Sequence, residues 1–164
     1  MKLLALMLAL CLALAIAVTG CGGSDSSSDS TSSSTESNLT DMSKKPDVTV
    51  PTGISPDKFA YKDIVEGTGP VAKSGDKVTV QYVGVGFDSE KEFDSSWSRN
   101  EPFSFPLGGG EVIKGWDQGV EGMKVGGRRE LVIPGSLAYG PAGSPPKIGP
   151  NETLIFVIDL LEVE

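Results

Sequence analysis

The sequence contains no histidine and only two cysteines in 164 residues. Without histidine, the Ser-His-Asp and Cys-His arrangements of nucleophilic catalysis cannot form, and most zinc sites lack a ligand. Cys11 lies in an apolar segment that we expect to be removed, so Cys21 alone would remain and no internal disulfide could form. Any activity of this chain must therefore work without an imidazole, a disulfide or a histidine-bound metal ion.

Basic residues are outnumbered by acidic ones, and the formal net charge is -8. An acidic chain argues against binding to nucleic acid, whose phosphates require a basic surface. The glycines at Gly108–Gly110 and Gly115 do not form a phosphate-binding loop, because Lys114 is not followed by serine or threonine and the spacing differs. We therefore expect neither a nucleic-acid partner nor a metal ion or other cofactor.

Residues 1–20 have the features of a secretory signal peptide. Lys2 supplies the positive charge, and Leu3–Val18 is an uninterrupted apolar run. The run is short for a membrane-spanning helix, which needs about 20 apolar residues. It ends in Val18-Thr19-Gly20-Cys21, which resembles the lipobox of bacterial lipoproteins. That resemblance implies a diacylglycerol on the Cys21 thiol, and a protein anchored by lipid in the bacterial cell envelope that faces the periplasm or the cell exterior.

Residues 21–57 have the composition of a flexible tether. Ser24–Ser37 contains nine serines in fourteen residues. Such a segment buries too little apolar surface to offset the entropy lost on ordering. Pro46–Pro56, with three prolines, is compatible with an extended path along the domain. Residues 58–164 remain, and they are enough for one domain but too few for two.

Alternation of apolar and polar residues predicts that this domain is rich in strands. Lys77–Val83 alternates most clearly, with Val78, Val80 and Tyr82 on one face. Further strands are predicted at Phe59–Val65, Glu92–Ser95, Phe103–Leu107, Arg128–Ile133 and Thr153–Val163. Ser136–Tyr139 is predicted to form one helical turn, and Pro141–Asn151, which holds four prolines, a stiff loop.

One short helix is predicted before the strand at Arg128–Ile133. The apolar stripe of this helix consists of Val112, Ile113, Trp116 and Val120. Gly119 and Gly122 limit its length, and a helix this short needs a surface to pack on. The pattern therefore predicts an α+β fold, a curved antiparallel β-sheet of about five strands wrapped around one short α-helix.

Six groups of residues follow one another through residues 58–164. They are Val80-Gln-Tyr-Val-Gly84, Phe93-Asp-Ser-Ser96, Pro102-Phe-Ser-Phe105, Val112-Ile-Lys-Gly-Trp-Asp-Gln-Gly-Val-Glu-Gly-Met123, Ile133-Pro with Ala138-Tyr-Gly140, and Thr153-Leu-Ile-Phe156. In this order and spacing the chain resembles the FKBP-type peptidyl-prolyl cis-trans isomerase family. The resemblance implies a curved sheet around a short helix, as above, and an enzyme that accelerates rotation about X–Pro peptide bonds.

The resemblance also implies a prolyl pocket with Trp116 as its floor. The implied catalytic residues are Tyr82, Phe93, Asp94, Trp116, Tyr139 and Phe156, and the implied substrate-binding residues are Phe103, Val112, Ile113 and Ile148. In the family, the backbone N–H at the Ile113 position and the Tyr139 hydroxyl hold carbonyl groups of a substrate or inhibitor, and Asp94 lies at the rim. Without the resemblance, such aromatic residues could equally be plain core, which is what we expect for Phe105 and Leu131.

The implied partners are proline-containing polypeptides that fold after export, and macrolide inhibitors. Relatives that dimerise carry a long helical N-terminal arm, whereas this N-terminal region is rich in serine, so we expect a monomer. Two other functions remain open from the sequence. The pocket could serve a holdase or docking module in which isomerisation is incidental, or the chain could be a structural surface lipoprotein without a pocket.

Departures from the family are local. Gly143–Pro150 is expected to form the loop over the pocket mouth, with Ser144 where relatives often carry a histidine and Lys147 where they carry an apolar residue. A lysine there is expected to keep its charge in water and to lend a ligand only its stem. Trp97 follows the second motif, and its role as a substrate contact or as loop packing stays open.

Overall fold

The computed structural model describes residues 39–164. The expected signal peptide, Cys21 and the serine-rich part of the expected tether lie outside the described residues. Within residues 39–164, no helix is both long enough and apolar enough to cross a membrane.

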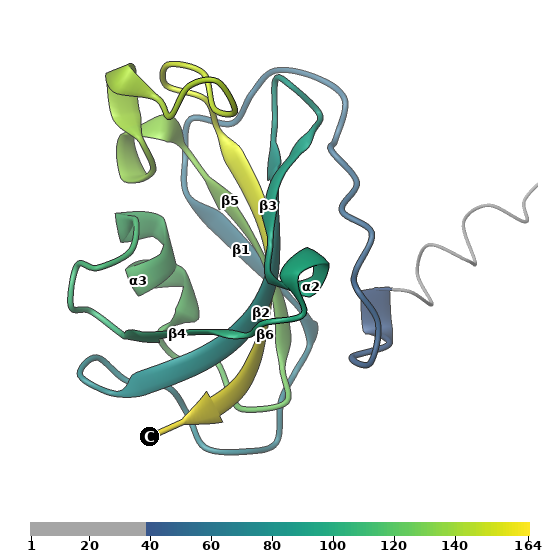
Figure 1. Cartoon of the computed structure of the whole chain (residues 1–164), viewed down its shortest axis with the longest axis vertical. Helices are drawn as coiled ribbons and strands as arrows, with labels where there is room; N and C mark the ends of the chain where they lie inside the picture. Colours follow the sequence, from purple (N-terminus) through teal and green to yellow (C-terminus); the bar gives the residue numbers. More distant parts are fainter. Residues whose placement is uncertain (1–38) are drawn as a thin grey trace, which may run out of the picture.

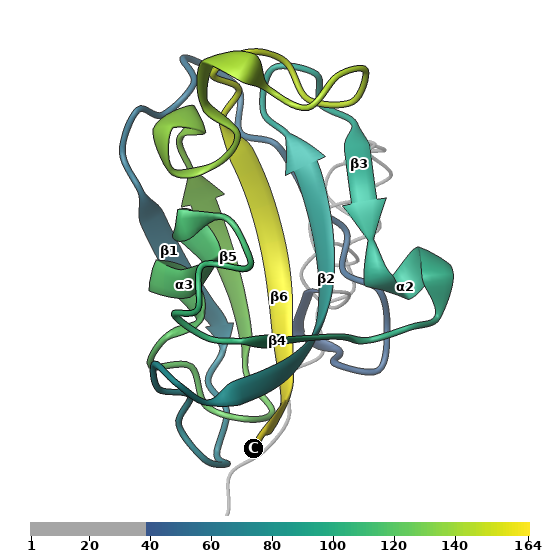
Figure 2. The ribbon, with the colours of Figure 1, turned by 60° about the vertical axis from the view of Figure 1, so that its left-hand side comes forward.

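Six strands of the described chain form one antiparallel sheet (Figures 1 and 2). In chain order they are β1 (Ala60–Val65), β2 (Lys77–Gly86), β3 (Glu92–Ser95), β4 (Phe103–Pro106), β5 (Arg128–Ile133) and β6 (Leu154–Val163). The strands lie in the order β1-β5-β6-β2-β3, and β4 pairs with the first part of β2 while β3 pairs with the later part. Because β3 and β4 share one edge of β2, the sheet is five strands wide, which confirms the predicted fold.

Burial along the central strands reflects what covers each face of the sheet. On β2, Val78, Val80 and Tyr82 are buried, as their alternation predicted. On β6, every residue from Leu154 to Leu160 is buried, so both faces of this strand are covered. Figure 1 shows the cause, with helix α3 on one side of the sheet and the chain that precedes β1 on the other.

Helix α3 (Lys114–Val120) packs closely on β5 because glycines face the sheet. A Cβ atom at Gly119 would lie 2.5 Å from Cδ1 of Leu131, and one at Gly115 would lie 2.3 Å from Cγ2 of Ile133. Arg129 of β5 holds the C-terminal end of the helix, because its Nη1 donates a 2.9 Å hydrogen bond to the Gly119 carbonyl. The two glycines thus shorten the distance between helix and sheet and bring Trp116 into the core.

The glycine turn before α3 is held by the helix itself. Asp117 accepts hydrogen bonds from the backbone N–H groups of Gly108 at 2.8 Å and Gly110 at 3.3 Å. Both glycines have positive φ angles, +75° and +71°, which residues with a Cβ rarely adopt. One carboxylate therefore fixes the turn that leads from β4 into the helix.

The structure contains short helical elements that the pattern did not predict or placed differently. Helix α2 (Ser96–Arg99) follows β3 and was not predicted. The predicted turn at Ser136–Tyr139 is a 3₁₀ helix, η1 (Gly135–Leu137), and a second one, η2 (Gly140–Ala142), follows within the segment predicted to be a loop.

Residues 39–57, here called the N-terminal strap, pack against the side of the sheet away from α3 (Figure 1). Arg128 of β5 is fully buried and donates to the backbone carbonyls of Leu39, Asp41 and Lys44 at 2.9, 3.3 and 3.0 Å. Its guanidinium also pairs with buried Asp159 of β6 at 2.6 Å. The tether was expected to continue to residue 57, and within it Leu39, Asp41 and Lys44 contact the domain through Arg128.

Candidate active site

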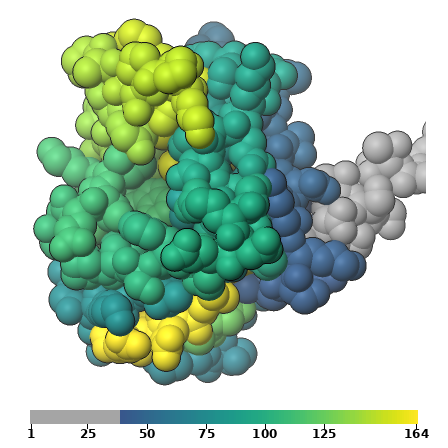
Figure 3. All heavy atoms as spheres, viewed as in Figure 1, coloured from purple at the N-terminus to yellow at the C-terminus, as the bar shows by residue number. Residues whose placement is uncertain are grey.

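The described structure contains a pocket of about 820 Å³. It opens between helix α3, the loop after β5, and β3, and it is visible in Figure 3 on the side of the molecule away from the strap. Its lining residues are Tyr82, Phe93, Asp94, Phe103, Gly110, Glu111, Val112, Ile113, Lys114, Trp116, Ser136, Ala138, Tyr139, Gly140 and Phe156. The cavity has a polar rim and is supplied by five elements, β2, β3, β4, β6 and α3, together with the turn before α3 and the segment that follows β5.

Aromatic rings packed edge to face form the bottom of this pocket. The Trp116 ring is 4 % exposed and lies 4.9 Å from the Tyr82 ring and 5.2 Å from the Phe156 ring, measured between centroids. Phe93 closes the adjoining wall, 5.5 Å from Phe156 and nearly perpendicular to it. A Cβ at Gly84 would lie 2.7 Å from both of these phenylalanine rings, so glycine on β2 gives them room. Rings in such contacts stabilise one another and hold a fixed surface.

A hydrogen-bonded group of three side chains lies at the rim. The Tyr82 hydroxyl donates to Oδ2 of Asp94 at 2.5 Å, Nη2 of Arg99 donates to the Tyr82 hydroxyl at 2.9 Å, and Nη1 of Arg99 pairs with Oδ1 of Asp94. Burial raises the pKa of Asp94, but the hydrogen bonds from Tyr82 and Arg99 outweigh it and hold the pKa below its usual value. Burial and the bond to Asp94 raise the pKa of Tyr82 to about 12. Asp94 is therefore ionised and Tyr82 neutral near pH 7.

Two hydrogen-bond donors at the pocket are available to a ligand. Ile113 precedes the first turn of α3, and its backbone N–H has no acceptor among residues 39–164. The Tyr139 hydroxyl likewise has no partner in the described chain, and its ring is 41 % exposed. Burial raises the pKa of Tyr139, with a further contribution from the charge of Asp94, so the phenol stays protonated and can donate. The site therefore offers an apolar floor and donors for carbonyl groups.

Comparison with known proteins assigns this arrangement to a family. Residues 69–161 match the family model of the FKBP-type peptidyl-prolyl cis-trans isomerases. The chain belongs to the FKBP-type peptidyl-prolyl cis-trans isomerase family. It is therefore a peptidyl-prolyl cis-trans isomerase, and its activity is the cis-trans isomerisation of peptide bonds that precede proline.

Individual relatives agree with the FKBP assignment. The chain is 60 % identical over 121 residues to an FK506-binding protein of Streptomyces anulatus, covering 73 % of this chain and 98 % of the relative. It is 54 % identical over 93 residues to the peptidyl-prolyl cis-trans isomerase FPR2 of Saccharomyces cerevisiae, covering 57 % and 69 %. The crystal structure of AtFKBP13 is similar with a TM-score of 0.61 and 41 % identity, covering 68 % of this chain and 97 % of that one.

The FKBP-type pocket contains nine of the ten residues that the sequence predicted for the site. The exception is Ile148, which is 4 % exposed and belongs to the hydrophobic core rather than to the pocket lining. In the loop, Ser144 and Ile148 exchange backbone hydrogen bonds. Phe105 and Leu131 are buried core residues outside the pocket lining, as expected.

The mouth loop also differs from its expected arrangement. Lys147 does not line the pocket, and its ammonium group is not left to water, since Nζ donates a 2.7 Å hydrogen bond to the Phe93 carbonyl. Trp97 lies in α2 outside the pocket lining, is half-buried, and has its Nε1 atom buried without a partner among the described residues. These positions favour packing over substrate contact for Trp97.

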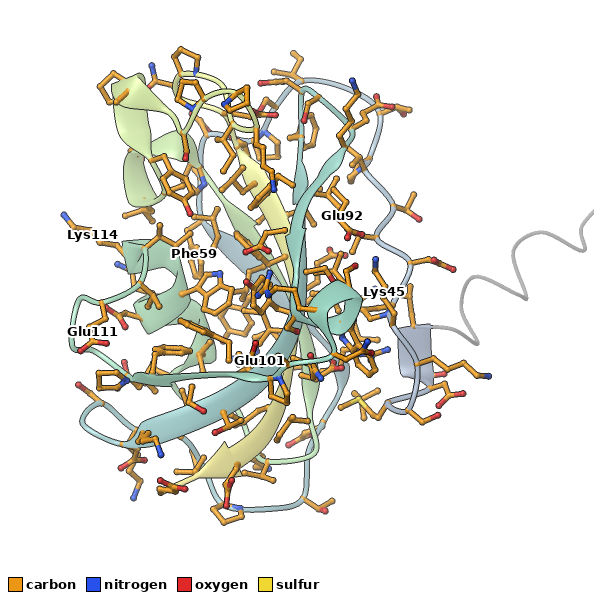
Figure 4. The ribbon with its side chains drawn as sticks, in the orientation of Figure 1. Lys45, Phe59, Glu92, Glu101, Glu111 and Lys114 are labelled. Carbon is orange, nitrogen blue, oxygen red and sulfur yellow. The ribbon has the colours of Figure 1, made fainter. Side chains whose placement is uncertain are left out.

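Sequence reasoning missed the rim charges. Arg99 completes the group with Tyr82 and Asp94, and Glu111 and Lys114 line the entrance (Figure 4). Arg99 is the last residue of α2, a single helical turn with no apolar period, so no pattern pointed to it. The local signal that does exist is Ser95, whose side chain accepts the Ser98 N–H and caps this turn.

Proposed function

We propose that this isomerase is exported, anchored to a membrane by a lipid on Cys21, and active on X–Pro bonds of polypeptides that fold outside the cytoplasm. The apolar run Leu3–Val18 and the sequence Val18-Thr19-Gly20-Cys21 support export and anchoring. The observation that carries the catalytic part is the pocket, where the aromatic floor around Trp116 lies beside the free donors of Ile113 and Tyr139.

The isomerase reaction is rotation about the C–N bond that precedes proline, and no covalent bond is broken. Resonance gives the C–N bond double-bond character and a barrier of about 18–20 kcal/mol. A twisted amide has lost that resonance, so its oxygen and nitrogen are less charged than in the planar amide. An apolar cavity such as the one around Trp116 and Phe156 favours the less polar twisted form over the planar one. Binding that is stronger in the twisted geometry lowers the barrier.

The polar groups of the site suit positioning rather than proton transfer. Both oxygens of Asp94 are already engaged by Tyr82 and Arg99, and the pKa of Asp94 is lowered below its usual value. Such a carboxylate is a poor acid or base near neutral pH. The Ile113 N–H and the Tyr139 hydroxyl can instead hold substrate carbonyls on either side of the proline.

The same pocket is proposed to bind FK506-type macrolides in competition with peptides. Support comes from the relative in Streptomyces anulatus, which is described as an FK506-binding protein, and from a pocket volume of about 820 Å³. Such a cavity falls within the range of about 300–1,000 Å³ that is usual for small-molecule sites.

Anchoring and export are tested by lipid labelling in cells. The wild-type chain should incorporate labelled fatty acid and fractionate with membranes, whereas Cys21→Ser should stay unlabelled and accumulate as an unprocessed or unlipidated precursor. Cys11→Ser is the matched control, because Cys11 lies in the segment expected to be removed, and its labelling should equal that of the wild type. Normal labelling of Cys21→Ser, or a wild-type chain that stays unlabelled in the cytoplasm, would contradict the proposal.

A further inference from the structure

Strand β3 carries a pocket wall although it lies at the edge of the sheet. It supplies Phe93 and Asp94 to the site. Its pairing with β2 shifts register between the pairs Gly84–Asp94 and Val85–Glu92, so Phe93 falls in the irregular step. Edge position and irregular pairing both reduce the number of ladder hydrogen bonds that hold a residue. The backbone of Phe93 therefore needs support from elsewhere.

Lys147 provides this support. Its ammonium group donates a 2.7 Å hydrogen bond to the Phe93 carbonyl from the loop on the other side of the pocket mouth. The charge makes this a stronger contact than a hydrogen bond between neutral groups. It ties the mouth loop to the strand that carries the wall, from outside the pocket.

The loop that carries Lys147 is held by its own hydrogen bonds and by a buried side chain. The Ile148 N–H donates to the Ser144 carbonyl at 3.0 Å, and the Ser144 N–H donates to the Ile148 carbonyl at 2.9 Å. The Gly149 N–H donates to buried Glu152 at 2.6 Å. The side chain of Ile148 is anchored in the core. The lysine therefore extends from a backbone that is held in place. Its hydrogen bond can thus fix the position of the Phe93 carbonyl.

We propose that Lys147 is a positioning residue of the isomerase site, which sets the Phe93 ring against Phe156 by holding the Phe93 carbonyl. Lys147 lies outside the pocket lining, so it acts through Phe93 and not on the substrate. This inference rests on the isomerase activity and is independent of the lipid anchor. We assign the Phe93 ring a contact with the proline in the planar and the twisted states alike, so its displacement should weaken the binding of both, which raises KM and leaves kcat nearly unchanged.

The test uses three variants of the full-length chain in an X–Pro isomerisation assay on a short peptide. Lys147→Met keeps the aliphatic stem and removes the donor, and its KM should rise by about threefold to tenfold, less than the full value of a charge-assisted hydrogen bond because only the displacement of Phe93 reaches the substrate. Lys147→Arg can donate to the same carbonyl and should remain within about twofold of the wild-type KM. Lys77→Met is the matched control, because its ammonium also makes a 2.7 Å contact, to Glu164, away from the pocket lining.

The pattern across the variants decides between positioning and a general structural role. An unchanged KM in Lys147→Met would overturn the inference, and so would a loss that Lys147→Arg does not recover or that Lys77→Met reproduces. Peptide affinity measured by calorimetry is the second readout, and it should weaken in Lys147→Met by the same factor as KM. A wild-type chain that binds the peptide without isomerising it would contradict the assigned activity, while the affinities would still test the role of Lys147.

Discussion

Two phenylalanines of β4 show that position, and not residue type, assigns an aromatic ring to the site or to the core. Phe103 is 38 % exposed and lines the pocket, whereas Phe105 is 2 % exposed and does not. Their rings stack with centroids 5.6 Å apart, and both lie against Trp116. The two rings form one continuous cluster, in which the member nearer the opening meets the ligand.

Tyr139 offers the simplest test of a single polar group, because its hydroxyl has no protein partner in residues 39–164. Tyr139→Phe removes one oxygen and keeps the ring. We expect a folded enzyme whose kcat/KM falls about fivefold, the equivalent of about 1 kcal/mol for one hydrogen bond. Isomerisation kinetics and a denaturant unfolding curve measure the two effects separately. Wild-type kinetics in this variant would show that the hydroxyl does not hold the substrate.

The lowered pKa of Asp94 makes the stability of the protein depend on pH in acid. Its folded-state pKa is lowered, because the hydrogen bonds from Tyr82 and Arg99 outweigh the effect of burial. A lowered pKa contributes stability above the unfolded-state pKa, and this contribution is lost as the pH falls through the folded-state value. Asp94→Asn should therefore be less stable than wild type at pH 7 by at most about 1 kcal/mol, as befits a half-exposed ion pair.

The comparison of Asp94→Asn with wild type must be repeated in acid. Below the pKa of the folded-state carboxyl, the two proteins should have nearly equal free energies of unfolding, since Asp94 is then neutral in both states of the wild type. A difference that stays constant from neutral to strongly acidic pH would show that the charge of Asp94 contributes nothing to stability.

At the scale of elements, the close approach of α3 to β5 depends on glycine. Gly119→Ala would gain about 1 kcal/mol of helix propensity. The new Cβ would, however, lie 2.5 Å from Cδ1 of Leu131, and overpacking of a core costs about 1–3 kcal/mol. We expect a net loss of about 1 kcal/mol in urea unfolding. Gln118→Ala on the exposed face is the control, and it should be neutral or slightly stabilising. A stabilised Gly119→Ala would mean that the helix does not need this glycine.

Elements were predictable where side chains carry a periodic signal. The alternation at Lys77–Val83 found β2, and the apolar stripe with Trp116 found α3, although Val112 and Ile113 of that stripe precede the helix. Helix α2 was missed because one turn is too short to show a period. Ile148 is buried in the core and is not part of the pocket lining, a placement that the sequence pattern could not give. Nine of ten site residues line the pocket, yet their placement came from family resemblance, since the aromatic pattern alone could not separate wall from core.

At the scale of the whole molecule, the N-terminal strap belongs to the folded structure. Arg128 is fully buried and binds three carbonyls of the strap as well as Asp159. Lys45 pairs with Glu92 of β3 at 2.6 Å (Figure 4), and Thr153 donates to the Pro56 carbonyl at 2.9 Å. Composition could not reveal this docking, because Arg128 recognises main-chain carbonyls, which every sequence has.

Removal of the strap should therefore destabilise the domain. A chain that begins at residue 58 leaves the guanidinium of Arg128 without its three carbonyl acceptors. We expect it to lose about 1–3 kcal/mol of unfolding free energy relative to a chain that begins at residue 39, the scale of hydrogen bonds to a charged group that water replaces only in part. Urea unfolding of both chains gives the difference. Equal midpoints would show that the strap adds no stability and that the domain is complete from residue 58.

The central claim is that the aromatic pocket isomerises X–Pro bonds without proton transfer. Its most direct test is kcat/KM for a short X–Pro peptide measured from about pH 5 to pH 8, the range in which histidine would titrate, in both water and heavy water. The chain has no histidine, the pKa of Asp94 is lowered, and that of Tyr82 is about 12, so neither Asp94 nor Tyr82 changes charge in this range. We predict a flat profile and a solvent isotope effect near unity. A bell-shaped profile with a large isotope effect would contradict the account, because it would require an acid or base in the rate-limiting step.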